Sequence, residues 1–256
     1  MRKPAVAGMF YPKDKDELKR SIHGLLDQGK EVKFKGELKA LIVPHAGYAY
    51  SGIVAGAGFK LLAGQQASRH YSKVILLGPS HQAYFSGAAI AAEDFETPLG
   101  TVKIGNISSW LKEELIAELP EAHRKEHCLE VELPFLQETL SKFELYALVL
   151  GEVDEKKLAE AIQQFVGKNT LLLVSSDLSH YLPYETAVRK DKEAINKILN
   201  FDFSPVEACG EKPIKVLMHL AKSLNWKPFL IDYQNSGDTA GDKSRVVGYA
   251  AIGYVK

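Results

Sequence analysis

Three short apolar runs along the chain share one form. Each run is β-prone, each stops at Pro, Gly or Ser, and each is followed by a histidine: LIVPH (41–45), VILLGPSH (74–81) and LLLVSSDLSH (171–180). Unbroken apolar runs of this length are typical of parallel strands that are buried on both faces. The pattern predicts three strands of one sheet, whose carboxyl-terminal loops carry His45, His81 and His180.

Segments with a helical repeat alternate with strand-like runs. The predicted helices span residues 14–27, 53–62, 107–119, 131–141, 155–166, 184–200 and 214–224. Further strands are predicted at residues 145–150, 228–232 and 246–255, and residues 87–92 and 101–104 are predicted to pair with each other. No linker or repeat interrupts the alternation, which is typical of α/β proteins. We predict a single α/β domain over residues 1–256, with a central, mostly parallel (mixed) sheet flanked by helices.

Composition narrows the possible partners. The chain has 256 residues, 46% hydrophobic and 25% charged, with a formal net charge of +0. This balance suits a soluble protein and does not favour binding to nucleic acid or to an anionic membrane. No apolar segment approaches the roughly 18 residues of a membrane span, and the two cysteines make no disulfide framework. We therefore expect a cytoplasmic protein, and a homo-oligomer is possible.

The strand-end histidines are candidates for a shared site. One histidine near a strand end is more often structural, but open α/β sheets bind ligands at the carboxyl ends of their strands, where all three would meet. Two imidazoles with a carboxylate are typical of non-haem iron sites, three imidazoles also suit zinc, and copper and nickel accept imidazole as well. Spacing does not name the metal, because the ligands come from separate strands.

Two other segments offer polar groups. The loop YQNSGDTAGDKSR (233–245) contains Asp238, a candidate metal ligand since Gly237 lets the backbone approach closely, and Arg245, a candidate anion partner. The alternative is an ordinary surface loop. In EHCLEVELPF (126–135), His127 and Glu130 are three residues apart and would share a helix face, although a solvated helix start explains them equally well.

Residues beside the histidines complete the candidate site. Four tyrosines are predicted to line a pocket for a flat or apolar substrate, although tyrosine is also common at half-buried rims: Tyr48, Tyr50, Tyr84 and Tyr181. Asp177 is predicted to cap the segment after its strand and to hold His180 in one tautomer. A serine hydrolase built on residues 175–180 is disfavoured, because no GxSxG motif is present. Cys209 is interpreted as a small core residue.

Several motifs together resemble the Memo family. They are PHAGYAYSG (44–52), LLGPSH (76–81), EHCLEVELPFLQ (126–137), SSDLSHY (175–181), ACGEKPI (208–214) and SGDTAGDKSRVVGYAA (236–251). The resemblance covers essentially the whole chain. The Memo family is similar in structure to the LigB-type class III extradiol dioxygenases, which are non-haem iron enzymes, so the resemblance implies a LigB-like fold.

The resemblance also implies roles for matched residues. His45 and His81 correspond to the two metal-ligating histidines, His180 to the acid/base of the ring-cleaving enzymes, and Asp177 to a pocket aspartate. The third ligand is a glutamate in those dioxygenases and a cysteine in animal Memo proteins. Here the matching neighbourhood is taken as residues 236–239, so Asp238 is expected to be the third ligand. A carboxylate with two histidines favours Fe(II), with Cu or Zn as alternatives.

Two functions follow as hypotheses. The first is a metal-dependent, dioxygenase-like oxidoreductase that acts on a small aromatic molecule, with His180 moving protons. The second is a non-catalytic module that binds an anionic or phosphotyrosine-like peptide group in the same cleft, since animal members are associated with phosphotyrosine peptides. A zinc hydrolase is less favoured, because no general-base glutamate accompanies the histidines in sequence.

Overall fold

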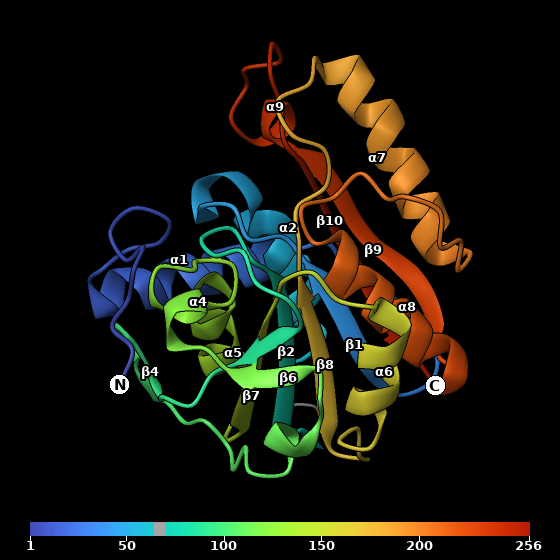
Figure 1. The fold of residues 1–256 in the computed structure, drawn as a ribbon. Helices are drawn as coiled ribbons and strands as arrows, with labels where there is room; N and C mark the ends of the chain where they lie inside the picture. The colour runs from blue at the N-terminus through green and yellow to red at the C-terminus, as the bar shows by residue number, and fades with distance from the viewer. Residues whose placement is uncertain (64–69) are drawn as a thin grey trace.

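A computed structural model describes residues 1–63 and 70–256 and shows one large mixed sheet (Figure 1). Its eight strands lie in the order β6-β3-β7-β2-β8-β1-β10-β9. The four central strands are parallel, whereas β3 and β10 run antiparallel to β7 and β1. The strands are β1 (Leu38–Val43), β2 (Lys73–Pro79), β3 (Ala88–Ile90), β6 (Ile116–Glu118), β7 (Glu144–Leu150), β8 (Thr170–Ser175), β9 (Lys227–Asn235) and β10 (Gly248–Val255). The predicted α/β class with a mixed sheet is confirmed.

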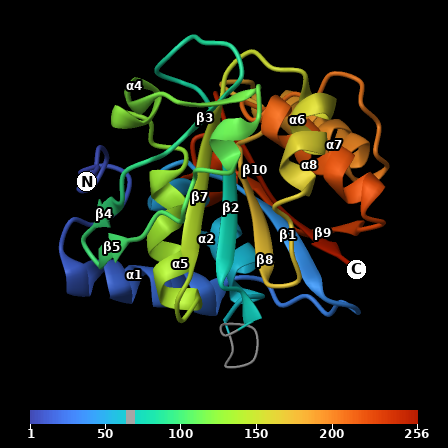
Figure 2. The same ribbon diagram turned by 60° about the horizontal axis from the view of Figure 1, so that its bottom comes forward.

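Helices cover both faces of the sheet (Figure 2). One face packs against α1 (Lys15–Gln28), α2 (Tyr48–Lys60) and α5 (Leu133–Thr139). The other face packs against α6 (Glu155–Gln163), α7 (Tyr184–Leu199) and α8 (Glu211–Ser223). The shorter elements are β4 (Phe95–Thr97), β5 (Gly100–Val102), α4 (Pro120–Arg124), α9 (Ser236–Thr239), η1 (Trp110–Lys112) and η2 (Glu130–Glu132).

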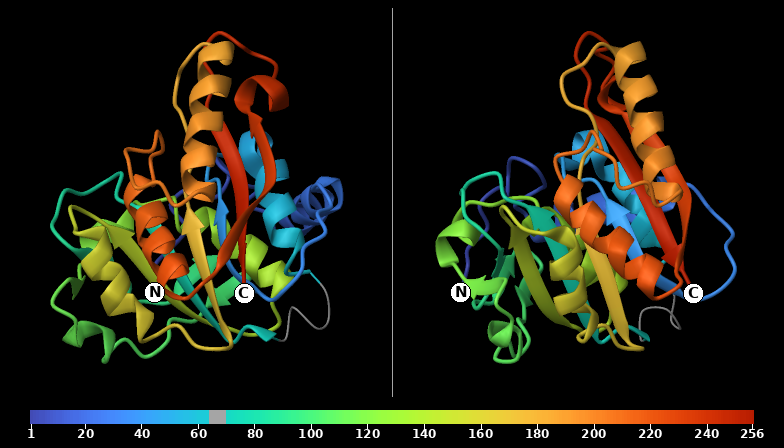
Figure 3. Two further views of the ribbon diagram at one scale, coloured as in Figure 1. Left: turned by 90° about the vertical axis from the view of Figure 1, so that its right-hand side faces the viewer. Right: turned by 45° about the vertical axis from the view of Figure 1, so that its right-hand side comes forward.

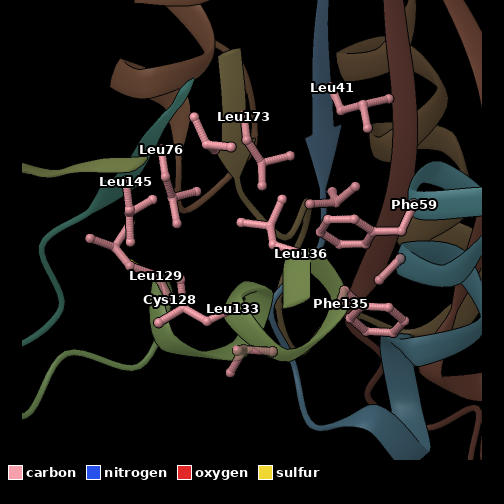
Figure 4. Packing of buried hydrophobic residues seen from close by; sticks show 14 of the residues in the cluster. Leu41, Phe59, Leu76, Cys128, Leu129, Leu133, Phe135, Leu136, Leu145 and Leu173 are labelled. Carbon is pink, nitrogen blue, oxygen red and sulfur yellow. The ribbon is translucent and has the colours of Figure 1, made fainter. Parts of the chain in front are cut away.

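The central strands are apolar at every position because both of their faces are buried. Leu41, Leu76 and Leu173 point toward α2 and α5 (Figure 4). On that side, the rings of Phe59 and Phe135 stack with centroids 4.8 Å apart and an interplanar angle of 1°. The alternate residues of the same strands belong to the second core, on the opposite face. Each fully buried leucine contributes about 1.5–3 kcal/mol to stability.

Glycines allow α2 to pack closely on two sides. The helix begins at Tyr48, five residues before the predicted start, and it contains Gly56 and Gly58. A Cβ atom at Gly56 would lie 2.4 Å from the Leu25 carbonyl oxygen of α1, and one at Gly58 would lie 2.8 Å from the Val43 side chain of β1. Each glycine therefore permits a close approach, to α1 in one case and to the sheet in the other.

The structure corrects two predicted features. The predicted helix at 107–119 is replaced by η1 and strand β6, and Trp110 and Ile116 enter the core from these two short elements. The predicted pairing of 87–92 with 101–104 is also wrong. Strand β3 joins the main sheet beside β7, and β5 forms a hairpin with β4. The turn at 98–100 closes that hairpin on the nearest residues, whereas the apolar β3 is buried in the main sheet.

The C-terminal part of the chain is more regular than the predicted loop at 233–245. Strand β9 continues to Asn235, and the single turn of α9 follows directly. Helix α7 lies along β9 and β10 (Figure 3). Within residues 1–63 and 70–256, no helix is both long and apolar enough to cross a membrane.

Candidate metal centre

The sheet order brings the three histidine-bearing strands together. Strand β8 lies between β1 and β2 and is parallel to both, with Leu41 and Leu76 each in register with Leu173. The three carboxyl ends therefore face the same edge of the sheet, and Figure 3 shows those of β1 and β8 side by side. At this edge the rings of His45 and His81 lie 5.2 Å apart at 85°.

Cys209 is the third side chain of the group. It lies in the turn before α8, and its Sγ is 3.3 Å from Nε2 of His45. The potential ligand atoms of His45, His81 and Cys209 all lie within 4.8 Å of one another. Sγ also accepts a hydrogen bond from the backbone N–H of Asp177 at 3.3 Å, so the loop after β8 positions the cysteine.

A buried hydrogen bond orients His45. Its Nδ1 lies 2.8 Å from Ser175 Oγ at the end of β8, and its backbone N–H donates to Asp177 Oδ1 at 2.8 Å. With Nδ1 engaged by Ser175, Nε2 is the nitrogen that faces Cys209. This arrangement, in which one ring nitrogen is held and the other is available, is typical of metal-binding histidines.

Glu126 holds His81 in the same manner. Its Oε1 lies 2.9 Å from His81 Nδ1, and its Oε2 accepts the His81 backbone N–H at 2.7 Å. The backbone N–H groups of His127 and Cys128 also donate to Oε1. Burial would raise the pKa of Glu126, but the hydrogen bonds and charge of His81 outweigh burial and lower it to about 2. Glu126 is thus a carboxylate that orients His81.

A second group of possible ligand atoms comes from His81, Glu126 and His127. These atoms also lie within 4.8 Å of one another. The oxygens of Glu126 already accept four hydrogen bonds from His81, His127 and Cys128. They have little capacity left for an ion. The group of His45, His81 and Cys209 is therefore the better metal centre.

Burial has the largest effect on the pKa values of His45, Cys209 and Asp177. Burial lowers the pKa of His45 well below its usual value, and nearby His81 and His127 lower it further. Burial and the Asp177 carboxyl raise the pKa of the Cys209 thiol to about 12. Burial also raises the pKa of Asp177, to about 7, although hydrogen bonds from the backbone N–H groups of His45 and Ala46 act to lower it. A bound metal ion would displace the thiol proton, because thiolate is the ligating form.

The family is decided by comparison of the whole chain. Residues 2–253 match the family described as Memo-like protein. The chain belongs to the Memo family. A MEMO1 family protein of Aquifex aeolicus is 40% identical over 271 residues, and one of Sulfurisphaera tokodaii is 35% identical over 282 residues. Each match covers 98% of this chain and 98% of the relative.

A solved structure extends the comparison to the fold alone. The uncharacterized protein JW3007 from Escherichia coli K12 superposes on this Memo family member with a TM-score of 0.53 at 10% identity. The match covers 85% of this chain and 99% of that one. The Memo fold is therefore shared with a protein of very different sequence.

The structure does not bring Asp238 to the histidines of this Memo protein. Asp238 is exposed, and its Oδ2 accepts the Asn235 backbone N–H at 3.0 Å in the capping box of α9. Its Oδ1 accepts the Tyr184 hydroxyl at 2.7 Å. Asp238 thus caps a helix, and Cys209 is the side chain that lies beside the two histidines. The signal was present in ACGEKPI (208–214), which carries a cysteine as animal Memo proteins do at the third ligand.

The predicted pocket tyrosines fall into two classes. Tyr48 is buried, and its hydroxyl donates to the Val131 carbonyl at 2.9 Å, so it belongs to the core and does not line a pocket. Tyr50, Tyr84 and Tyr181 are exposed by 48%, 91% and 63%. Tyr181 has a φ of 57°, and the guanidinium of Arg245 lies 5.3 Å from its ring centroid.

His180 lies close to the centre without joining the ligand group. Its Nδ1 is 2.8 Å from the Leu178 carbonyl oxygen, which accepts only, so Nδ1 carries the proton and Nε2 the lone pair. Burial lowers the pKa of His180, and the charge of nearby His81 lowers it further. The predicted second role of Asp177, holding the His180 tautomer, thus falls to Leu178, while Asp177 supports His45 and Cys209.

Proposed function

We propose that this Memo protein is a metal-dependent oxidoreductase whose ion is held by Nε2 of His45, Nε2 of His81 and Sγ of Cys209. The observation that carries the proposal is the convergence of these three side chains within 4.8 Å, with the other nitrogen of each imidazole already engaged. Three protein ligands leave coordination positions open for a substrate, as in catalytic metal sites.

The donor set favours a redox metal. A thiolate with two imidazoles suits copper, while Fe(II) and zinc also accept these ligands. The expectation of Fe(II) depended on a carboxylate from Asp238, so we now place copper first and Fe(II) second. Such an ion, when bound, would supply one-electron and oxygen chemistry.

Residues of the chain would accept a proton from the substrate and leave the metal centre open to solvent. The His81 side chain is 27% exposed and Cys209 is partly exposed, so a small aromatic molecule can reach the centre from solvent. Nε2 of His180 carries a lone pair and can accept a proton from a substrate hydroxyl near neutral pH, because burial keeps the ring neutral. Asp177 would hold the backbone of His45 and the Cys209 sulfur in place.

Metal analysis tests the proposal. Protein purified without oxygen and offered copper, Fe(II) or zinc is expected to bind one redox ion per chain. His45→Ala, His81→Ala and Cys209→Ser should each abolish stoichiometric binding, whereas the control Asp238→Asn should bind as the wild type does. Full metal content in Cys209→Ser, or its loss in Asp238→Asn, would refute the ligand assignment.

A second candidate function is a binding module for an anionic or phosphotyrosine-like peptide group. It is favoured by Tyr181, which follows His180 directly and is exposed, and by the exposed guanidinium of Arg245, which lies 5.3 Å from the Tyr181 ring. Binding of a phosphotyrosine peptide that persists with a chelator and fails in Arg245→Ala would support this function. Oxygen uptake with a catechol would instead support the enzyme.

A further inference from the structure

The short helix η2 carries two buried carboxyl groups with contrasting surroundings. Glu130 and Glu132 are both 0% exposed. Glu130 accepts hydrogen bonds from Arg2 Nη1 at 2.8 Å, the Tyr11 hydroxyl at 2.7 Å, and the backbone N–H groups of Ala5 and Val6. Four donors, one of them a cation, are the environment of an ionised carboxylate.

Glu132 has no comparable set of donors. Its Oε1 lies 2.9 Å from Ser175 Oγ, and its Oε2 has no hydrogen-bond partner in the described part of the chain. The charged form of such a carboxyl is costly to bury. Burial accordingly raises the pKa of Glu132 well above its usual value. The carboxyl of Asp177 raises this pKa further, and the contact with Ser175 lowers it by less than burial raises it.

The hydrogen bonds of Ser175 show where the protons lie. Its Oγ is 2.7 Å from the Cys128 carbonyl oxygen, 2.8 Å from His45 Nδ1 and 2.9 Å from Glu132 Oε1. A serine hydroxyl has one proton and two lone pairs. The carbonyl can only accept, so the Ser175 proton goes to Cys128. The other two contacts must then donate to Ser175: Nδ1–H of His45 and O–H of Glu132.

The opposite arrangement leaves a conflict. If Glu132 were ionised and took the Ser175 proton, the hydroxyl oxygen and the Cys128 carbonyl oxygen would face each other at 2.7 Å with no proton between them. No salt bridge of the described residues reaches Glu132, whereas Arg2 pairs with Glu130. The groups of the described residues that interact with Glu132 are Ser175, Asp177, Tyr48 and Cys128, and none of them is a cation.

We propose that Glu132 is a neutral carboxylic acid that donates its proton to Ser175 and, through Ser175, positions His45 for metal binding. Glu132 is a positioning residue, since it contacts neither the ion nor a substrate. With Glu132 and His45 donating and Cys128 accepting, all three hydrogen-bonding positions of Ser175 are filled, and its oxygen is held against Nδ1 of His45. The metal part of this inference rests on the proposed function, but the placement of the proton does not.

Infrared spectroscopy of the metal-free protein tests the proton placement. At about pH 9, where ordinary carboxyl groups with a pKa of about 4 are ionised, the wild type should show the C=O stretch of a protonated carboxyl. The band should disappear in Glu132→Gln and remain in Glu130→Gln, the matched buried carboxyl two residues away. If Glu130→Gln does not fold, the difference between the infrared spectra of the wild type and Glu132→Gln is sufficient to decide whether Glu132 is protonated. A wild type without the band, or a band retained in Glu132→Gln, overturns the proposal.

Metal affinity tests the positioning role. Glutamine keeps a neutral group with a donor toward Ser175, so Glu132→Gln should bind copper within about threefold of the wild type, while Glu132→Leu should lose about 10–100-fold. A large loss in Glu132→Gln would indicate an ionised Glu132, and equal affinity in Glu132→Leu would show that Glu132 does not position His45. If the wild type binds no metal, the proposed function fails, and the infrared band still decides the state of Glu132.

Discussion

Replacing Glu126 by glutamine tests most directly whether the Glu126 carboxylate holds His81 in place. The Glu126 side chain is 1% exposed and accepts hydrogen bonds from the backbone N–H and Nδ1 of His81 and from the backbone of His127 and Cys128. Glutamine has the same shape but only one acceptor oxygen. Its NH₂ group would therefore face an N–H donor, and the negative charge opposite His81 would be lost.

The size of the effect follows from the pKa of Glu126. Its usual value of 4.5 falls to about 2 in the folded protein, because the interactions with His81 outweigh burial. This difference corresponds to about 3 kcal/mol of folding stability. Since the folded-state pKa is the lower one, the stabilisation is complete above the unfolded-state value and is lost as the pH falls toward about 2. In a chain of this size, 3 kcal/mol lowers the melting temperature by about 6–12 °C.

Denaturant unfolding of Glu126→Gln measures this loss. At pH 7 we expect a decrease of about 3 kcal/mol relative to the wild type, shrinking to about 1 kcal/mol at pH 3. The matched control is Glu121→Gln on α4, an exposed carboxylate that, within residues 1–63 and 70–256, forms an ion pair with Arg124 alone. This change should alter stability by less than about 0.5 kcal/mol. Copper affinity should fall about 10–100-fold in Glu126→Gln. A decrease below 1 kcal/mol at pH 7, or one that is independent of pH, would refute the assigned role of the carboxylate.

Three further substitutions test other assignments. Asp238→Ala should cost about 1 kcal/mol or less in denaturant unfolding, through loss of the α9 cap, and should leave metal content unchanged; a loss of metal would contradict Cys209 as third ligand. Tyr48→Phe should lower the free energy of unfolding by about 1 kcal/mol, because the hydrogen bond to the buried Val131 carbonyl is lost, and it should leave the affinity for aromatic ligands unchanged in a binding assay. Weaker binding would indicate that Tyr48 contacts the ligand. Glu130→Gln should cost about 3–5 kcal/mol in thermal unfolding, because it leaves the Arg2 charge buried without its partner; a smaller loss would mean that Arg2 reaches solvent.

Much of the site follows from local patterns. The apolar runs at residues 41–43, 74–77 and 171–174 predict buried strands, and all three are found adjacent and parallel in the sheet. Because parallel neighbours end at one edge, His45 and His81 meet there, as predicted. Where the apolar pattern was weaker, as at 107–119, the predicted helix was wrong, since a single 3-10 turn and a three-residue strand supply the buried side chains of this segment.

Contacts between segments that are distant along the chain leave no comparable pattern in the sequence. Cys209 and His45 are 164 positions apart in sequence, and their atoms meet only because the turn before α8 lies over the carboxyl end of β1. The sequence analysis favoured the carboxylate of Asp238 over Cys209, yet the oxygens of Asp238 accept hydrogen bonds from Asn235 and Tyr184.

The sequence by itself therefore determined the α/β class, the three central strands and the histidines at their ends, because burial on both faces requires continuous apolar runs and the loops that follow must carry the polar groups. Only the tertiary structure decided which side chain lies beside the two histidines, which carboxylate orients His81 and how the surroundings of Glu130 and Glu132 differ. Those assignments depend on which donors surround each buried group, and the donors come from segments far away along the chain.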